Sequence, residues 1–151
     1  DVLTLFMAMD CSVELYKGGI ISLQEYAERP YDRDILVRLI VKKEEAEFFY
    51  QSVRNSQTDI PVLTCAAARL ADGSYRIAIG ARPLKAVLYA FPAQAGVPAQ
   101  ELARKLADEV KRQIVTGSNM RGSAEYRRHL AGVLTKRAVV ELEARAVQEE
   151  N

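Results

Sequence analysis

The chain has 151 residues, the length of one domain, and 49% of them are hydrophobic, so it should bury a substantial core. Its 21 Lys and Arg against 20 Asp and Glu give a formal net charge of +1, which excludes a global electrostatic attraction to nucleic acid or anionic lipid. Two cysteines and one histidine exclude a zinc site of four Cys, or of paired Cys and His, and a four-cysteine iron–sulfur site within this chain.

The sequence carries no sign of secretion or of membrane insertion. It lacks a signal peptide, and no apolar stretch approaches the roughly 20 residues that span a bilayer. Cys65 lies in the apolar run 62–68, which favours buried, reduced cysteines over a disulfide. We therefore expect a cytoplasmic protein that makes no membrane contact. Apolar residues follow Asp1 almost at once, which indicates a piece of a longer protein.

A short hairpin and a linker are expected first along the chain. Residues 11–15 alternate between apolar and polar side chains, and Gly18 and Gly19 form a turn dipeptide before the apolar residues that follow. Residues 24–33 are charged and show no lasting apolar period. We therefore place a linker between two subdomains at residues 29–34.

Two strands and a polar loop are expected next. Residues 35–41 are rich in β-branched side chains, as in a strand in the middle of a sheet. A second strand starts at residues 48–50, and residues 52–59 form a polar loop that Pro61 bounds. Judged on its pattern alone, this loop is equally well explained as a ligand-binding loop and as an ordinary connection.

The next segment predicts an antiparallel pair of strands. Residues 62–69 are small and apolar, so another element should approach them closely, and Asp72 and Gly73 then supply a strong hairpin turn signal. Residues 75–80 alternate as a second strand would. Three prolines between residues 83 and 98 exclude a long helix or a central strand across that stretch.

Two amphipathic helices complete the chain. The first begins at Pro98 and stops at Gly117, and its apolar side chains recur every fourth residue: Leu102, Leu106, Val110 and Ile114. The second begins at the N-cap Ser123 and frays from Glu141. We expect Tyr126, Leu130, Val133, Leu134 and Val140 on its core face, with Arg127, Arg128 and Lys136 outward or at its borders. Strands followed by helices indicate an α+β fold, with the helices on one face of an antiparallel sheet.

The sequence contains few candidates for chemistry. His129 falls at the border of the helix face, and Cys65 has only apolar company, so packing explains both better than catalysis does. The glycines form neither GxGxxG nor a P-loop, so a nucleotide diphosphate would need another domain to hold it. The basic side chains of residues 121–137 would suit RNA, but stacking aromatics are missing beside them, so a solvated face or an inter-subunit contact is favoured.

Several motifs, in order, resemble one family. The segment 121–134 reads RGSAEYRRHLAGVL and is similar to the helix signature near the end of the flavin-binding subunit of the molybdenum hydroxylases, the xanthine and carbon monoxide dehydrogenase family. Upstream, residues 34–36 (DIL) resemble the entry to the first strand of the family's C-terminal domain. Residues 49–60 resemble its flavin-facing loop, and residues 76–80 (RIAIG) its next strand.

The resemblance implies a fold and a set of partners. It implies an antiparallel sheet of three to four strands packed by about three helices over residues 34–151, with residues 1–33 as the tail of a preceding FAD-binding domain. In the family this subunit holds FAD, receives electrons from iron–sulfur clusters and passes them to NAD or another acceptor. Molybdopterin and the 2Fe-2S clusters belong to partner subunits, and no catalysis is expected of this piece alone. A homodimer is left open.

The resemblance also implies flavin contacts. By position in the motifs these are Asp34, Leu36, Ser52, Arg54, Asp59 and Ile60. The loop is shorter than usual by about a residue, and it has Ser52 and Arg54 where the family has further basic side chains. This difference supports an alternative, a free-standing protein-interaction domain that has lost flavin. A third hypothesis is an RNA-binding domain that uses the basic helix.

Overall fold

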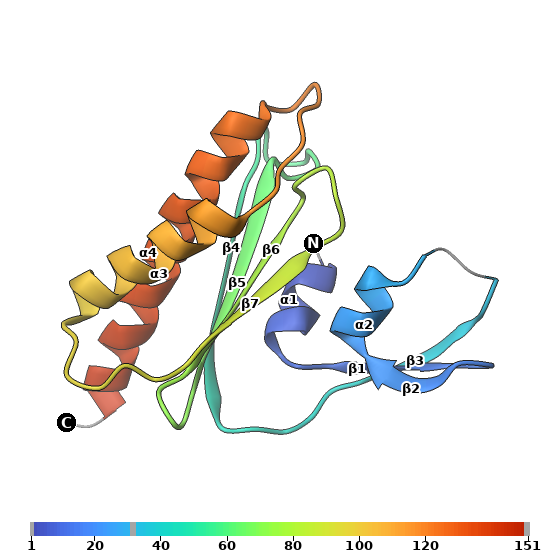
Figure 1. The fold of residues 1–151 in the computed structure, drawn as a ribbon, viewed down its shortest axis with the longest axis horizontal. Coiled ribbons are helices and arrows are strands. Elements are labelled where there is room, and N and C mark those ends of the chain that lie inside the picture. Colours follow the sequence, from blue (N-terminus) through green and yellow to red (C-terminus); the bar gives the residue numbers. More distant parts are fainter. Residues whose placement is uncertain (1, 31–32, 150–151) are drawn as a thin grey trace.

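A computed structural model describes residues 2–30 and 33–149, and it forms two lobes built on separate antiparallel sheets (Figure 1). The smaller sheet has the strand order β2-β1-β3, and the larger has the order β4-β5-β6-β7. Two long helices cover one face of the larger sheet, as expected. The α+β prediction is thus confirmed.

The N-terminal lobe contains the expected hairpin and two short helices. Its elements before β3 are α1 Val2–Ala8, β1 Ser12–Leu15, β2 Gly19–Ser22 and α2 Leu23–Glu28. The hairpin turn lies at the two predicted glycines, and Gly19 has a φ of 68°, a conformation that favours glycine. Strand β1 pairs with β2 on one side and with β3 on the other, so it is the central strand of the small sheet.

The charged stretch after the hairpin begins with a helix that the sequence did not predict. Helix α2 forms there because the Ser22 hydroxyl accepts a hydrogen bond from the Glu25 N–H at 3.0 Å, and because Leu23 and Ala27 are buried. Six residues are too few to show a helical period in the sequence. Of the expected linker 29–34, residues 31–32 lie outside the described part of the chain.

Strand β3, Leu36–Ile40, is an edge strand, so the prediction of a mid-sheet strand is wrong. It pairs with β1, placing Leu39 opposite Val13, and most of its side chains are exposed. Beta-branched residues favour a strand whether it lies inside or at an edge, so composition did not distinguish the two. The chain changes sheets between Ile40 and Ala46.

The four-stranded sheet has a core of small side chains. Its strands are β4 Ala46–Val53, β5 Leu63–Leu70, β6 Tyr75–Gly80 and β7 Val87–Phe91. The predicted turn joins β5 to β6. Strand β7, an edge strand between prolines, was not predicted from the sequence. Helix α1 packs on the face opposite the long helices, where a Cβ on Gly80 would collide with the Thr4 hydroxyl. The Thr4 hydroxyl also lies 2.9 Å from the Thr64 hydroxyl of β5, so the close approach expected at residues 62–69 is confirmed.

The other face carries α3 Ala99–Gln113 and α4 Ala124–Glu149. The predicted apolar stripe of α3 is buried, although the helix ends four residues before Gly117. Helix α4 extends to Glu149 rather than fraying from Glu141. In the C-terminal part of α4, Glu143 joins the helix to the sheet. Its Oε1 lies 2.9 Å from Arg69 Nε and also accepts a hydrogen bond from the Tyr75 hydroxyl.

The orientation of α4 differs from the prediction by a rotation about its axis. Arg127 is completely buried, whereas Tyr126, expected in the core, is 44% exposed. The residues that do face the core recur with helical spacing: Arg127, Leu130, Ala131, Leu134, Ala138 and Leu142.

Candidate functional site

The loop between β4 and β5 is held in shape by its own side chains. Arg54 donates from Nη1 to the Asp59 carbonyl oxygen at 2.5 Å and from Nε to the Ser52 hydroxyl at 3.3 Å. The Asp59 carboxylate accepts the Ile60 N–H at 2.7 Å. Three of the predicted site residues thus fix the conformation of one turn, and the fourth, Ile60, projects from it with 63% of its surface exposed.

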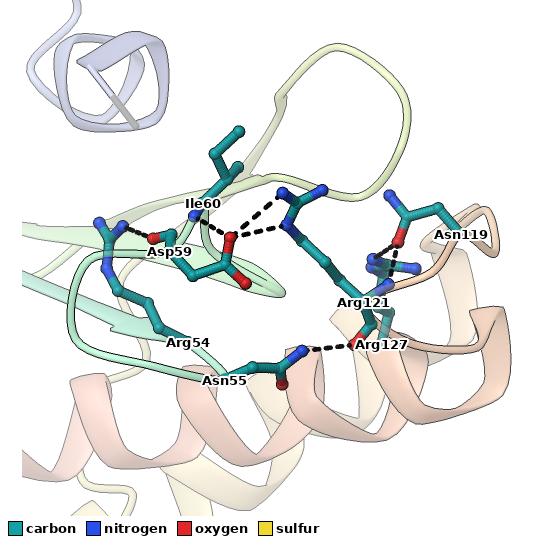
Figure 2. A network of polar contacts seen from close by, with 7 residues as sticks. All are labelled: Arg54, Asn55, Asp59, Ile60, Asn119, Arg121 and Arg127. Carbon is teal, nitrogen blue, oxygen red and sulfur yellow. Dashed lines mark hydrogen bonds and ion pairs between the residues drawn. The ribbon is translucent and has the colours of Figure 1, made fainter.

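A second segment reaches the loop from between α3 and α4. Arg121 directs Nε and Nη2 to Asp59 Oδ1, at 3.2 and 3.1 Å, and the Asn55 side chain donates to the Arg121 carbonyl at 3.4 Å (Figure 2). The Ile60 N–H and then the Arg121 guanidinium lower the pKa of Asp59 from its ordinary value. Asp59 is therefore an ionised carboxylate at neutral pH.

Arg127 fixes the segment that carries Arg121. Its guanidinium donates from Nε to the Val62 carbonyl at 2.9 Å, from Nη2 to Asn119 Oδ1 at 2.5 Å, and from Nη1 to two more carbonyls, those of Gly117 and Gly122. Asn119 Oδ1 also accepts the Arg121 N–H at 2.9 Å (Figure 2). Burial lowers the pKa of Arg127, but an arginine stays charged at neutral pH. One buried cation therefore ties the end of the loop to the start of α4.

Sequence reasoning did not find the roles of Arg121 and Arg127. Both were grouped with the basic residues of the second helix, because a charge is normally placed outside a core. One signal was present for Arg127: it lies three residues before Leu130 and seven before Leu134, on the same helical face. No comparable signal pointed Arg121 at Asp59, since the two residues are 62 positions apart.

The resemblance to the molybdenum hydroxylase family was tested by comparing the sequence with models of known protein families. The model of the CO dehydrogenase flavoprotein C-terminal domain matches residues 48–142, more than half of the chain. The chain belongs to this family. The matched segment contains α3, α4 as far as Leu142, nearly all of the four-stranded sheet and the whole Asp59–Arg121–Arg127 network.

Individual proteins are similar to this chain in sequence or in fold. The protein YgfM of Escherichia coli K12, itself uncharacterised, is 26% identical over 133 residues, which are 88% of this chain and 49% of that protein. Quinoline 2-oxidoreductase from Pseudomonas putida 86 has a similar fold, with a TM-score of 0.76, 17% identity, and coverage of 94% of this chain and 55% of that one. Carbon monoxide dehydrogenase from Hydrogenophaga pseudoflava gives a TM-score of 0.75 at 20% identity, covering 96% and 56%. The chain thus spans about half the length of these proteins.

The remaining two predicted site residues of this flavoprotein domain lie in the other lobe. Both Asp34 carboxylate oxygens accept backbone N–H groups of the β1–β2 turn, with Gly18 N at 2.8 Å and Lys17 N at 3.0 Å, and the Ile35 N–H also donates to it, at 2.8 Å. These N–H groups, that of Lys17 foremost, lower the pKa of Asp34. Leu36 follows on β3 and is 46% exposed. Figure 1 shows this end of the small sheet well apart from the β4–β5 loop.

The described residues provide apolar contacts for a flavin ring but no loop for its diphosphate. Ile60 and Leu36 are exposed apolar side chains of the kind that a flat aromatic ring would cover. Within the described ranges, no glycine-rich loop leads into a helix to hold a diphosphate. Because Ile60 and Leu36 lie in different lobes, each offers a separate, partial contact rather than a site for the complete cofactor.

The other residues considered for chemistry take no part in this site. His129 is exposed on α4. Burial raises the pKa of the Cys65 thiol to about 12, so it is not a nucleophile at neutral pH. No cluster of His, Cys, Asp and Glu suited to a metal ion occurs in residues 2–30 and 33–149. The helices of those residues include none with the length and hydrophobicity needed to cross a membrane.

Proposed function

We propose that this chain is the C-terminal part of the FAD-binding subunit of a molybdenum hydroxylase of the xanthine and CO dehydrogenase type. Residues 1–33 are the tail of the preceding FAD-binding domain, and residues 34–151 are the C-terminal domain that closes over the flavin. The family match supports this proposal, together with an exposed Ile60 beside a fixed, ionised Asp59.

The FAD of this subunit would accept electrons from iron–sulfur clusters on a partner subunit and pass them to NAD or another acceptor. Asp34, Leu36, Ser52, Arg54, Asp59 and Ile60 contribute to its site. Ile60 excludes water from the ring and the Asp59 carboxylate places a negative charge near it, while Asp34 and Leu36, in the other lobe, contact a different part of the FAD. Arg54 and Arg121 keep that carboxylate from moving.

The proposal includes the rest of the complex. The partners are a molybdenum-binding subunit and an iron–sulfur subunit, and the complex works in the cytoplasm. Substrate hydroxylation belongs to the molybdenum subunit, so this chain has no catalytic residue of its own.

One observation favours a second candidate, a protein-interaction domain without flavin. Arg54 and Arg121 both donate to Asp59, which leaves few of its hydrogen-bonding groups for a ligand. The family's usual basic side chain is also replaced by Ser52. The two candidates differ in a single property, the affinity of the full-length subunit for FAD.

The experiment measures flavin absorbance near 450 nm and FAD affinity in the full-length subunit and two variants. Ile60→Glu puts a charge against the proposed ring contact, and Ile20→Glu is the matched control, because Ile20 is 64% exposed on the hairpin. We expect FAD in the wild type and in the control, and an affinity lower by about tenfold or more in Ile60→Glu, since burying an unpaired charge is costly. Absence of FAD from the wild-type subunit would favour the second candidate.

A further inference from the structure

A groove starts between α3 and α4 and continues along α4 to the edge strand β4. It consists of two adjoining hollows of about 160 and 550 Å³ that share Val133 and Lys136. The floor is formed by small or apolar residues: Ala107, Gly132, Val133, Val140 and Phe49. The groove is therefore shallow and partly apolar at its base.

The rim of the groove carries a surplus of positive charge. Arg104, Lys111, Lys136 and Arg137 line it, and none of them forms an ion pair with another described residue. The groove also has two carboxylates. Asp108 is one, and the other, Glu141, is already paired with Arg145 at 3.1 Å. In a chain whose net charge is only +1, this concentration of cations is local.

We propose that this groove is a docking site for an acidic segment of a partner subunit that also carries apolar side chains. This inference rests on the proposed function, because it takes the occupant from the same complex. Carboxylates of the segment pair with Lys136, Arg137, Arg104 and Lys111, while its apolar side chains fill the hollow over Phe49 and Val140. Charge complementarity selects such a partner and speeds its docking.

The shape of the groove favours protein over nucleic acid. Single-stranded RNA binds where exposed aromatic rings stack on bases beside the cations. Phe49, the aromatic residue of the groove, is partly buried, and the Arg145 guanidinium already lies over its ring, 5.5 Å from the centroid. The apolar floor instead suits aliphatic side chains.

The test is co-purification of the tagged full-length subunit with its molybdenum and iron–sulfur subunits, at 50 mM and at 500 mM NaCl. Lys136→Glu/Arg137→Glu reverses two rim charges, and Lys43→Glu/Lys105→Glu is the control, with the same change of charge at exposed positions outside the groove. Arg104→Glu/Lys111→Glu tests the other hollow, so the proposal does not depend on one variant folding. Flavin absorbance and circular dichroism report folding in each case.

We expect both groove variants to assemble about tenfold more weakly than the wild type at 50 mM NaCl, with the control unchanged and the wild-type complex weakened by 500 mM NaCl. Equal assembly of all variants would overturn the docking proposal and leave the proposed function standing. A wild-type subunit that binds neither partner would overturn both. Binding of a 20-nucleotide oligouridylate that the groove variants lose, with the complex intact, would overturn the proposal in favour of RNA.

Discussion

Replacing Arg127 with methionine should destabilise the fold more than almost any other single change on α4. The variant keeps an apolar stem of similar volume and removes the guanidinium. Four hydrogen bonds are then lost; the carbonyls of Val62 and Gly117 lose this donor, whereas the Gly122 carbonyl keeps the Asn119 N–H. Hydrogen bonds to charged groups contribute about 1.5–3 kcal/mol each to stability. Part of this loss, several kcal/mol, is offset because the variant no longer has to desolvate a buried cation. The net cost is about 4 kcal/mol.

The assay is urea unfolding followed by circular dichroism at 222 nm. For a protein of this size m is about 2 kcal/mol/M, so a loss of about 4 kcal/mol lowers the urea midpoint by about 2 M. Arg128→Met is the matched control, because Arg128 is the next residue, carries the same charge and is exposed. It should change the free energy of unfolding by less than about 0.5 kcal/mol. A midpoint for Arg127→Met within about 0.5 M of the wild type would refute the structural role given to this residue.

Other changes test the packing and the electrostatics separately. Gly80→Ala should lower the free energy of unfolding by about 1–3 kcal/mol, because the new methyl group would collide with α1. Gly132→Ala should raise it by about 0.5–1 kcal/mol, because the new methyl group makes ordinary contacts on a helical backbone. The same urea assay measures both changes. The Ile60 N–H and the Arg121 guanidinium lower the pKa of Asp59 in the folded state. These contacts therefore add stability above the unfolded pKa of about 3.9, and that stability is lost as the pH falls through the folded value. A carboxyl NMR titration with a midpoint above about 4 would contradict this. Cys65 should resist alkylation at pH 8 until urea unfolds the protein, because burial raises the pKa of its thiol to about 12, and rapid labelling of the native state would contradict this burial.

Local patterns predicted those parts of the fold that local chemistry determines. Asp72 and Gly73 marked a turn by their backbone preferences alone, and the spacing from Leu102 to Val110 marked a helix face. Helix α2 was missed because tertiary burial of Leu23 and Ala27 stabilises it more than any repeating pattern does.

The candidate site was predicted only in part, for a physical reason. The motif placed Ser52, Arg54, Asp59 and Ile60 together because they are close in sequence, at the end of β4 and in the loop that follows it. The partner of that loop, Arg121, comes from a segment distant in sequence, and an ion pair between such segments leaves no periodic signal. A buried arginine contradicts the rule that charges stay outside a core, so Arg127 could be recognised only once its carbonyl partners were known.

The flavin reduction potential of the full-length subunit carrying Asp59→Ala tests the account most directly. Asp72→Ala serves as the control, because Asp72 lies in the β5–β6 turn, at the opposite end of β5 from the Asp59 loop. Removing a fixed negative charge beside the ring should raise the potential and alter the flavin spectrum, while the control keeps both unchanged. Identical potentials, spectra and FAD affinities in the two variants would show that the β4–β5 loop does not face the flavin.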